Sequence, residues 1–169
     1  MKNGLKTIFF LVGNYGVGKS TLIKEPVINK DSIFLEIRPN LFVLGTDICG
    51  ADSLSSFKKE NVLNLIKTNT DKNIIIAGNY YCSIKDVQEL HPYFKLVIIY
   101  LNTNYRTNKE RIAKRGKEIN AETYVSKLKA HKSFIEKTRG LRRLYIIDNN
   151  KPLNETKPIF NKIIADETN

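Results

Sequence analysis

Runs of apolar residues alternate with longer polar or amphipathic stretches along this chain. Five runs have the length and apolar character of strands, and they cover residues 7–12, 41–44, 73–77, 96–101 and 144–147. The first is expected to be buried on both faces because its apolar run is continuous, and the run at residues 73–77 is also expected to be buried. A sixth strand-like run, residues 33–37, is separated from the run at residues 41–44 by the turn signal Arg38-Pro39-Asn40, and its place in the sheet is ambiguous. Strands that alternate with helices favour an α/β fold. We therefore expect a five-stranded, mostly parallel sheet in the order 2-3-1-4-5, sandwiched by helices.

The stretches between these strands show helical spacing of apolar residues. Helices are expected over residues 18–29, 53–67, 83–90, 102–115, 121–138 and 154–165. Proline should disturb the first helix at Pro26 and interrupt the last at Pro158. Because the chain contains no repeat and no linker-like segment, we expect a single domain over residues 1–169, with a short lid around residues 102–118.

Nothing in the sequence indicates a membrane segment or a secretory leader. No apolar run approaches the roughly 20 residues that cross a bilayer, and the first six residues lack the apolar stretch of a secretory signal. We expect a cytoplasmic protein without a membrane partner. The two cysteines, Cys49 and Cys82, form no metal-ligand pattern and are expected to be reduced thiols.

A strong excess of positive charge narrows the choice of partners. The chain has 28 Lys and Arg residues against 17 Asp and Glu residues, a formal net charge of +11. Residues 111–143 contain eleven basic and three acidic residues, and so hold eight of these net charges. One nucleotide cannot use so much charge, whereas a DNA backbone can. The alternative is a lysine-rich composition inherited from an AT-rich genome.

A glycine-rich segment joins the first expected strand to the first expected helix. Gly13-Asn14-Tyr15-Gly16-Val17-Gly18-Lys19-Ser20 matches the pattern of Gly, four free positions, Gly, Lys, and Ser or Thr. In this pattern main-chain N–H groups and the positive end of the helix dipole face phosphate oxygens. Lys19 is expected to neutralise the β- and γ-phosphates, Ser20 to bind Mg²⁺, and Thr21 to support the α-phosphate. The segment predicts a phosphate-binding loop (P-loop).

The nucleotide is expected to be ATP. A guanine-recognition motif should follow a strand, but Asn69-Thr70-Asp71-Lys72 precedes one. Small size, one P-loop and a late arginine-rich helix favour a kinase over a switch or a motor. Arg106, Arg111 and Arg115 fall on that helix, and the last two share one helix face. We expect Arg111 and Arg115 to stabilise the charge of the transferred phosphoryl group; the alternative is a solvated basic face.

Transfer to a hydroxyl group also needs a carboxylate that orients the nucleophile. The end of the strand at residues 73–77 offers no acid, only Ala77-Gly78-Asn79. Asp47 and Asp52 lie in the loop that follows residues 41–44, at the sheet edge where open α/β sheets bind substrates. Asp52 is the first choice for the general base. Its alternative role is to cap the helix expected from Ser53.

These residues resemble one kinase family. The strand end Val43-Leu44-Gly45 leads into Cys49-Gly50-Ala51-Asp52-Ser53-Leu54. With the P-loop, residues 74–78 and the arginine helix, this segment resembles bacteriophage P-loop kinases that phosphorylate 5-hydroxymethyluracil in DNA, within the nucleoside and nucleotide monophosphate kinase-like superfamily. The similarity covers most of the chain in order. The chain departs from the family pattern at Ala77, where an acidic residue is often expected before Gly78.

The resemblance implies transfer of the ATP γ-phosphate to the hydroxymethyl oxygen of a modified pyrimidine in double-stranded DNA, as a step in base hypermodification within a host cytoplasm. Such a base must leave the helical stack. Tyr80 and Tyr81 are expected to stack on it, with simple packing as the alternative. The basic residues expected to contact DNA phosphates are Lys129, Lys132, Arg142 and Arg143.

Three other functions remain open at the level of sequence. A kinase of free nucleosides or nucleoside monophosphates would share the P-loop and the arginines. A polynucleotide 5′-hydroxyl kinase would explain both the positive charge and a hydroxyl acceptor. A non-catalytic nucleotide-binding regulatory protein is favoured by Ala77 in place of an acid.

Overall fold

A seven-stranded sheet forms the centre of the molecule in the computed structural model, which describes residues 4–47 and 50–169. The order is β2-β3-β4-β5-β1-β6-β7. The strands are β1 (Thr7–Gly13), β2 (Asn29–Asp31), β3 (Phe34–Arg38), β4 (Leu41–Leu44), β5 (Asn73–Ala77), β6 (Lys95–Asn102) and β7 (Arg143–Asp148). Strands β4, β5, β1, β6 and β7 are parallel to one another, while β2 and β3 extend the β4 edge as an antiparallel pair.

The five parallel strands confirm the expected order 2-3-1-4-5, because they are the five runs picked out by sequence. The ambiguous run at residues 33–37 is also a strand, and β2 adds a further one, so the expected count of five was too low. Every residue of β1 is buried, as is typical of a central parallel strand with helices on both faces. Its register pairs Gly13 with Leu101, and β6 pairs Leu101 with Ile147.

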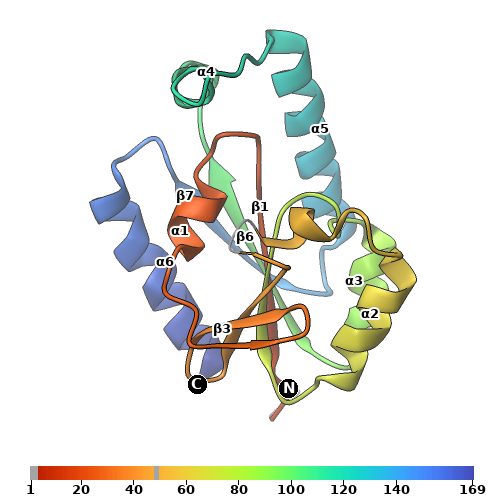
Figure 1. Cartoon of the computed structure of the whole chain (residues 1–169). Helices are drawn as coiled ribbons and strands as arrows, with labels where there is room; N and C mark the ends of the chain where they lie inside the picture. The colour runs from red at the N-terminus through yellow and green to blue at the C-terminus, as the bar shows by residue number, and fades with distance from the viewer. Residues whose placement is uncertain (1–3, 48–49) are drawn as a thin grey trace.

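Helices cover both faces of the sheet (Figure 1). The helical elements are α1 (Lys19–Ile23), the 3₁₀ helix η1 (Gly50–Leu54), α2 (Lys59–Thr68), α3 (Ile84–Leu90), α4 (Tyr105–Ala113), α5 (Ala121–Lys137) and α6 (Leu153–Thr168). Polar side chains cap three of them: Ser83, Asn104 and Asn120 each accept a hydrogen bond from a main-chain N–H in the first turn of α3, α4 and α5. In the described part of the chain, no helix is long and apolar enough to cross a membrane.

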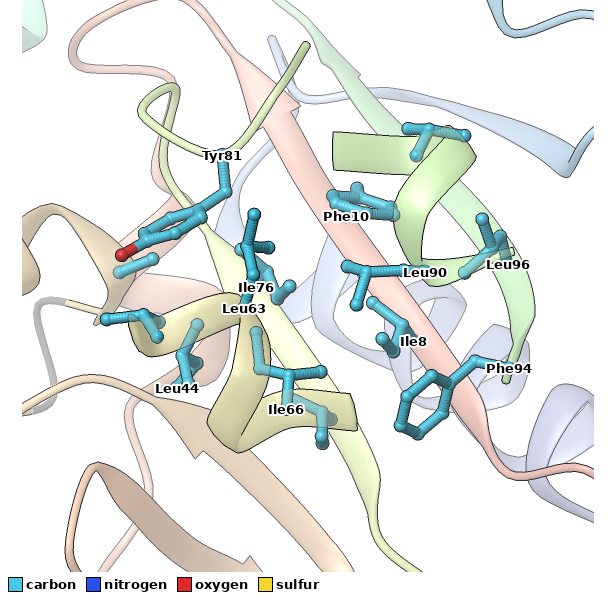
Figure 2. Close-up of a cluster of buried hydrophobic side chains, with 14 of the residues drawn as sticks. Ile8, Phe10, Leu44, Leu63, Ile66, Ile76, Tyr81, Leu90, Phe94 and Leu96 are labelled. Carbon is cyan, nitrogen blue, oxygen red and sulfur yellow. The ribbon is translucent and has the colours of Figure 1, made fainter. Parts of the chain in front are cut away.

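Two apolar clusters join the helices to the sheet. On one face, β-strand residues such as Ile8 and Phe10 pack against Leu63 and Ile66 of α2 and Leu90 of α3 (Figure 2). On the other face, α1 and α6 pack against the sheet, and the cluster they form contains Leu22, Ile23, Phe160, Ile163 and Ile164. The fold is therefore a three-layer α/β sandwich that holds the carboxyl ends of the parallel strands at one edge.

Helices α1, α2 and α6 show the main differences from the expected helices. Helix α1 ends at Ile23 rather than residue 29, because a residue that precedes proline avoids helical geometry and the chain is already extended at Lys24, ahead of Pro26. Helix α2 begins at Lys59 rather than residue 53, since residues 53 and 54 belong to η1 and residues 55–57 form a turn and a bend. Helix α6 continues through Pro158, because the burial of its apolar face on the sheet offsets one missing hydrogen bond.

Candidate active site

The loop at residues 13–18 leaves β1 at the carboxyl edge of the sheet and enters α1. Gly16 has φ +70° and Gly18 has φ +96°, in the left-handed region that favours glycine. A Cβ atom on Gly16 would lie 2.6 Å from Cγ1 of Ile112 in α4. Both positions therefore need glycine for backbone conformation, and Gly16 also needs it for the close approach of the lid. Because α1 has only five residues, its dipole supports anion binding less than expected, and main-chain N–H groups and Lys19 become the main contributors.

Three buried asparagines hold the P-loop in shape. The Asn14 side chain donates to the Tyr124 carbonyl over 3.0 Å and accepts from the Tyr15 N–H over 3.0 Å. The Asn108 side chain, from α4, donates to the Tyr15 carbonyl, and the Asn149 side chain, which follows β7, donates to the carbonyl of Val17. The roles of Asn108 and Asn149 could not be predicted from sequence, because their partners are more than ninety residues away.

Lys19 lies across the loop that it belongs to. Its ammonium group donates to the carbonyls of Gly13 (2.8 Å) and Asn14 (3.1 Å). Burial lowers the Lys19 pKa to about 8, the charge of Asp52 opposes that shift, and the positive charge of Arg115 adds to it. Burial is thus the main cause of the lowered Lys19 pKa, and the Asp52 carboxylate offsets part of that shift.

A cleft of about 310 Å³ opens between the P-loop, α4 and the segment that joins β7 to α6. It is lined by Gly16, Gly18, Thr21, Arg111, Lys114, Arg115, Asn149, Lys151, Leu153 and Thr156. These lining residues include four cations and no carboxylate, so the cleft suits the polyphosphate of ATP. Ser20 and Thr21 are exposed beside it.

The described residues hold no group of three or more His, Cys, Asp or Glu side chains that could bind a metal. Mg²⁺ commonly keeps several water ligands and binds through substrate phosphates instead of an all-protein cage. The Ser20 hydroxyl is placed to supply one protein ligand at the start of α1. The residues present therefore fit both ATP and Mg²⁺.

The arginine lid expected around residues 102–118 lies against the P-loop. Helix α4 forms its main part, and Arg111 donates to the Val17 carbonyl over 3.3 Å. The Arg115 side chain acts on the pKa of Lys19, so the structure brings both arginines to the phosphate cleft. Arg106 instead is exposed and pairs with Glu110 over 3.1 Å.

Asp52 occupies the edge of the sheet at the end of β5. Its carboxylate accepts a hydrogen bond from the Asn79 N–H over 3.3 Å, and a Cβ on Gly78 would lie 2.4 Å from its Oδ1 atom. The Asp52 carboxylate therefore lies at the end of β5, where the strand itself has Ala77 and no acidic residue. Asp52 lies inside η1 and does not cap α2, which begins at Lys59, so the alternative role is wrong.

The other candidate acid lies elsewhere. Asp47 is exposed and lines a hollow with Lys24, Glu25 and Thr46, beside the segment that joins α1 to β2. Asp52, by contrast, acts directly on the Lys19 pKa. Cys49, part of the segment that carries the family resemblance, is outside the described residues.

The two adjacent tyrosines have different environments. Tyr80 is 41% exposed, and the Lys59 ammonium lies 5.3 Å from its ring centroid. Tyr81 is 0% exposed and packs among the apolar side chains of Figure 2, near Leu44 and Ile76. The expectation that Tyr81 stacks on a base is therefore wrong, because its ring is already covered by the core. Tyr80 keeps a free face.

The predicted DNA-contacting residues separate into two places. Lys129 and Lys132 are exposed on α5. Arg142 and Arg143 lie at the start of β7, at the opposite end of the strands from the P-loop, since Arg143 pairs in register with Val97. Arg142 donates to the Ile135 carbonyl over 2.7 Å, and Arg143 pairs with Glu167 over 3.1 Å. The two arginines do not join the site.

One buried histidine near the site was missed by sequence analysis. His131 Nε2 lies 2.9 Å from Asn79 Oδ1, and the His131 side chain is buried. Burial lowers its pKa to about 4, so the ring is neutral at pH 7. A lone histidine on a lysine-rich helix carries no signal of this contact, which depends on how α5 packs over the end of β5.

Several solved structures that share this fold are kinases. No protein-family model and no curated protein sequence matches the chain. Shikimate kinase from Bacteroides thetaiotaomicron superposes with a TM-score of 0.55 at 14% identity, over 96% of this chain and 99% of that one. Shikimate kinase from Acinetobacter baumannii gives 0.52 at 15% identity, over 98% and 97% of the two chains. Deoxyadenosine kinase from M. mycoides gives 0.50 at 16%, over 94% and 99%. At these identities the similarity establishes the fold, and this chain has the α/β fold of P-loop kinases.

Proposed function

We propose that the protein is an ATP-dependent phosphotransferase that acts on a hydroxyl group. The observation that carries this proposal is that Lys19 and Asp52 both lie at the carboxyl edge of the sheet, where the charge of Asp52 acts on the Lys19 pKa. Lys19 belongs to the phosphate-binding loop, and Asp52 is a carboxylate within electrostatic reach of it. A phosphate donor and an activated hydroxyl can therefore lie side by side.

Each residue has one task in this reaction. The acceptor hydroxyl gives its proton to Asp52, and its oxygen forms a bond to the γ-phosphorus as the bond to the bridging oxygen of ADP breaks. Lys19, Arg111 and Arg115 stabilise the charge on the transferred oxygens. Mg²⁺, held in part by Ser20, would neutralise charge between the β- and γ-phosphates.

The acceptor that we favour is the hydroxymethyl group of 5-hydroxymethyluracil in double-stranded DNA. The sequence resemblance around Asp52 supports this choice. So does the position of exposed Lys129 and Lys132 on α5, the helix that reaches both the P-loop and the end of β5. Tyr80 offers an exposed ring next to Asn79 for an extruded base. The product would be a phosphomethyl base, an intermediate in base hypermodification.

A kinase of free nucleosides or nucleotides is the second candidate. The fold likeness to a deoxyadenosine kinase, solved with dCMP and dCDP, favours it. Such an enzyme would need the same loop and the same carboxylate, but not the lysines on the outer face of α5. The two functions therefore differ in which acceptor is labelled, and in whether Lys129 and Lys132 matter.

A transfer assay separates these functions. The protein is mixed with Mg²⁺, ATP labelled at the γ-phosphate, and one of four acceptors: duplex DNA with 5-hydroxymethyluracil, the same duplex with thymine, free nucleosides, or 5′-hydroxyl oligonucleotides. We expect label only on the hydroxymethyluracil duplex, and none with Lys19→Ala. Label on free nucleosides would establish the second candidate. Label on 5′ ends would indicate a polynucleotide kinase, and ATP binding without any transfer would indicate a regulatory protein.

A further inference from the structure

Helix α5 spans both halves of the candidate site. At its first turn, the Tyr124 carbonyl accepts the hydrogen bond from Asn14 in the P-loop, over 3.0 Å. Seven residues later, His131 contacts Asn79 at the acceptor edge, over 2.9 Å. Residues 124, 127 and 131 share one helix face, because they are spaced by three and four positions. Lys127 therefore lies between the phosphate-donor contact and the acceptor contact. Figure 1 shows α5 running from beside α4 down toward α3.

The side chain of Lys127 is turned inward. It is half-buried, and its ammonium lies 5.1 Å from the ring centroid of Tyr15 in the P-loop. Its positive charge acts on two side chains of the site: it adds to the effect of burial on the Lys19 pKa, and it acts on the His131 pKa in the same direction. Within the described part of the chain, no ion pair connects Lys127 to a carboxylate.

This arrangement differs from that of the other α5 lysines. Lys129 and Lys132 are exposed, and water can screen their charge. Lys127 instead is half-buried beside Tyr15 of the P-loop, where its charge, the charge of Arg115 and the carboxylate of Asp52 all act on Lys19. Like charges repel, and an anion bound between them offsets that repulsion. A phosphoryl group in transfer carries its charge on three oxygens and would satisfy all three cations.

We infer that Lys127 contacts the γ-phosphoryl group of ATP as it passes from the P-loop toward Asp52. The inference rests on the proposed function and adds a catalytic cation from α5 to those of the loop and the lid. It separates the role of Lys127 from that of Lys19: Lys19 serves the β- and γ-phosphates, whereas Lys127, which lies on α5 between the P-loop contact and the Asn79 contact, serves the γ-phosphate alone. ADP should therefore bind without help from Lys127.

Calorimetric titration tests this inference without an acceptor. The wild type, Lys127→Ala, Lys127→Arg and the matched control Lys129→Ala are each titrated with Mg²⁺-ADP and with a non-hydrolysable Mg²⁺-ATP analogue. We expect Lys127→Ala to weaken analogue binding about tenfold, the size of one charge-assisted contact, and to change ADP binding less than about twofold. Lys127→Arg should restore much of the loss, and Lys129→Ala should bind like the wild type. Thermal unfolding of each variant checks that the fold is kept.

The titrations distinguish a wrong role for Lys127 from a wrong proposed function. Equal losses for ADP and the analogue, or no loss for either, would overturn the role of Lys127 while leaving the phosphotransferase intact. An equal loss in Lys129→Ala would show a general charge effect and also overturn it. A wild type that binds neither nucleotide would refute the proposed function itself. With an acceptor at hand, Lys127→Ala should lower kcat, with little change in KM for the acceptor.

Discussion

The pH dependence of ATP affinity tests the environment of Lys19. Burial lowers the pKa of this lysine to about 8, from an ordinary value of about 10.4. The protonated form binds phosphate, so affinity should fall as pH rises through 8. The terminal phosphate, with a pKa of about 6, is already ionised in this range and adds no opposing change.

The size of the effect follows from the protonated fraction. With a pKa of about 8, roughly nine-tenths of the Lys19 ammonium is protonated at pH 7 and roughly one-tenth at pH 9. Because only the protonated fraction is competent, the apparent Kd for Mg²⁺-ATP should rise about tenfold between these pH values. Bound phosphate restores the proton to Lys19, so binding near pH 8 should also take up a proton.

Calorimetry in buffers of different ionisation enthalpy measures both quantities. The matched control is Lys19→Arg, because arginine stays charged throughout this range; its affinity, whatever its absolute value, should not change between pH 7 and 9. A wild-type Kd that is constant from pH 7 to 9, with no proton uptake, would refute the reasoning about Lys19.

Three further predictions concern other parts of the molecule. Asp52→Asn should lower kcat by about 10²- to 10⁴-fold, as expected for loss of a general base, while ATP affinity measured by calorimetry stays within a few-fold; surviving turnover would remove Asp52 from the mechanism. Tyr81→Phe should stabilise the fold by about 1 kcal/mol in urea unfolding, since the buried hydroxyl has no partner among the described residues; a marked loss would show an unseen partner. Glu167→Ala should destabilise the fold by about 3 kcal/mol, because the buried carboxylate pairs with Lys95 over 2.6 Å. Burial opposes its ionisation, but hydrogen bonds from Lys95 and Tyr145 lower its pKa. Its contribution should therefore be present above about pH 4.3 and be lost as pH falls below that value, which unfolding curves at several pH values would show.

The strand order could be predicted because each parallel strand is a continuous apolar run. The β2–β3 extension could not, since Asn29–Asp31 is polar and exposed and has no alternating pattern. It forms because β3 pairs with β4 and the chain turns at Ser32 with positive φ. The spacing of apolar residues also could not predict where α2 begins. Leu54 fits the helical spacing and is buried in the core, but it belongs to η1, which ends before α2 starts.

The P-loop could be predicted because its function depends on eight consecutive residues, which the sequence shows directly. The acceptor side depends on contacts between distant segments. Asp52 reaches Gly78 because β4 and β5 are neighbours in the sheet, so an acid from one strand end can stand in for an alanine at the next. Likewise, one of two adjacent tyrosines is in the core and the other is exposed, and only the packing of α2 and α3 decides which.

The central claim is that residues 13–20 hold the phosphates of ATP and direct the γ-phosphate toward Asp52. A crystal structure of the protein with Mg²⁺ and a non-hydrolysable ATP analogue tests this most directly. We expect the β-phosphate within the loop, the Lys19 ammonium moved from the carbonyls of Gly13 and Asn14 onto phosphate oxygens, and the γ-phosphate facing Asp52. An analogue bound elsewhere, or a γ-phosphate that points away from Asp52, would contradict the account.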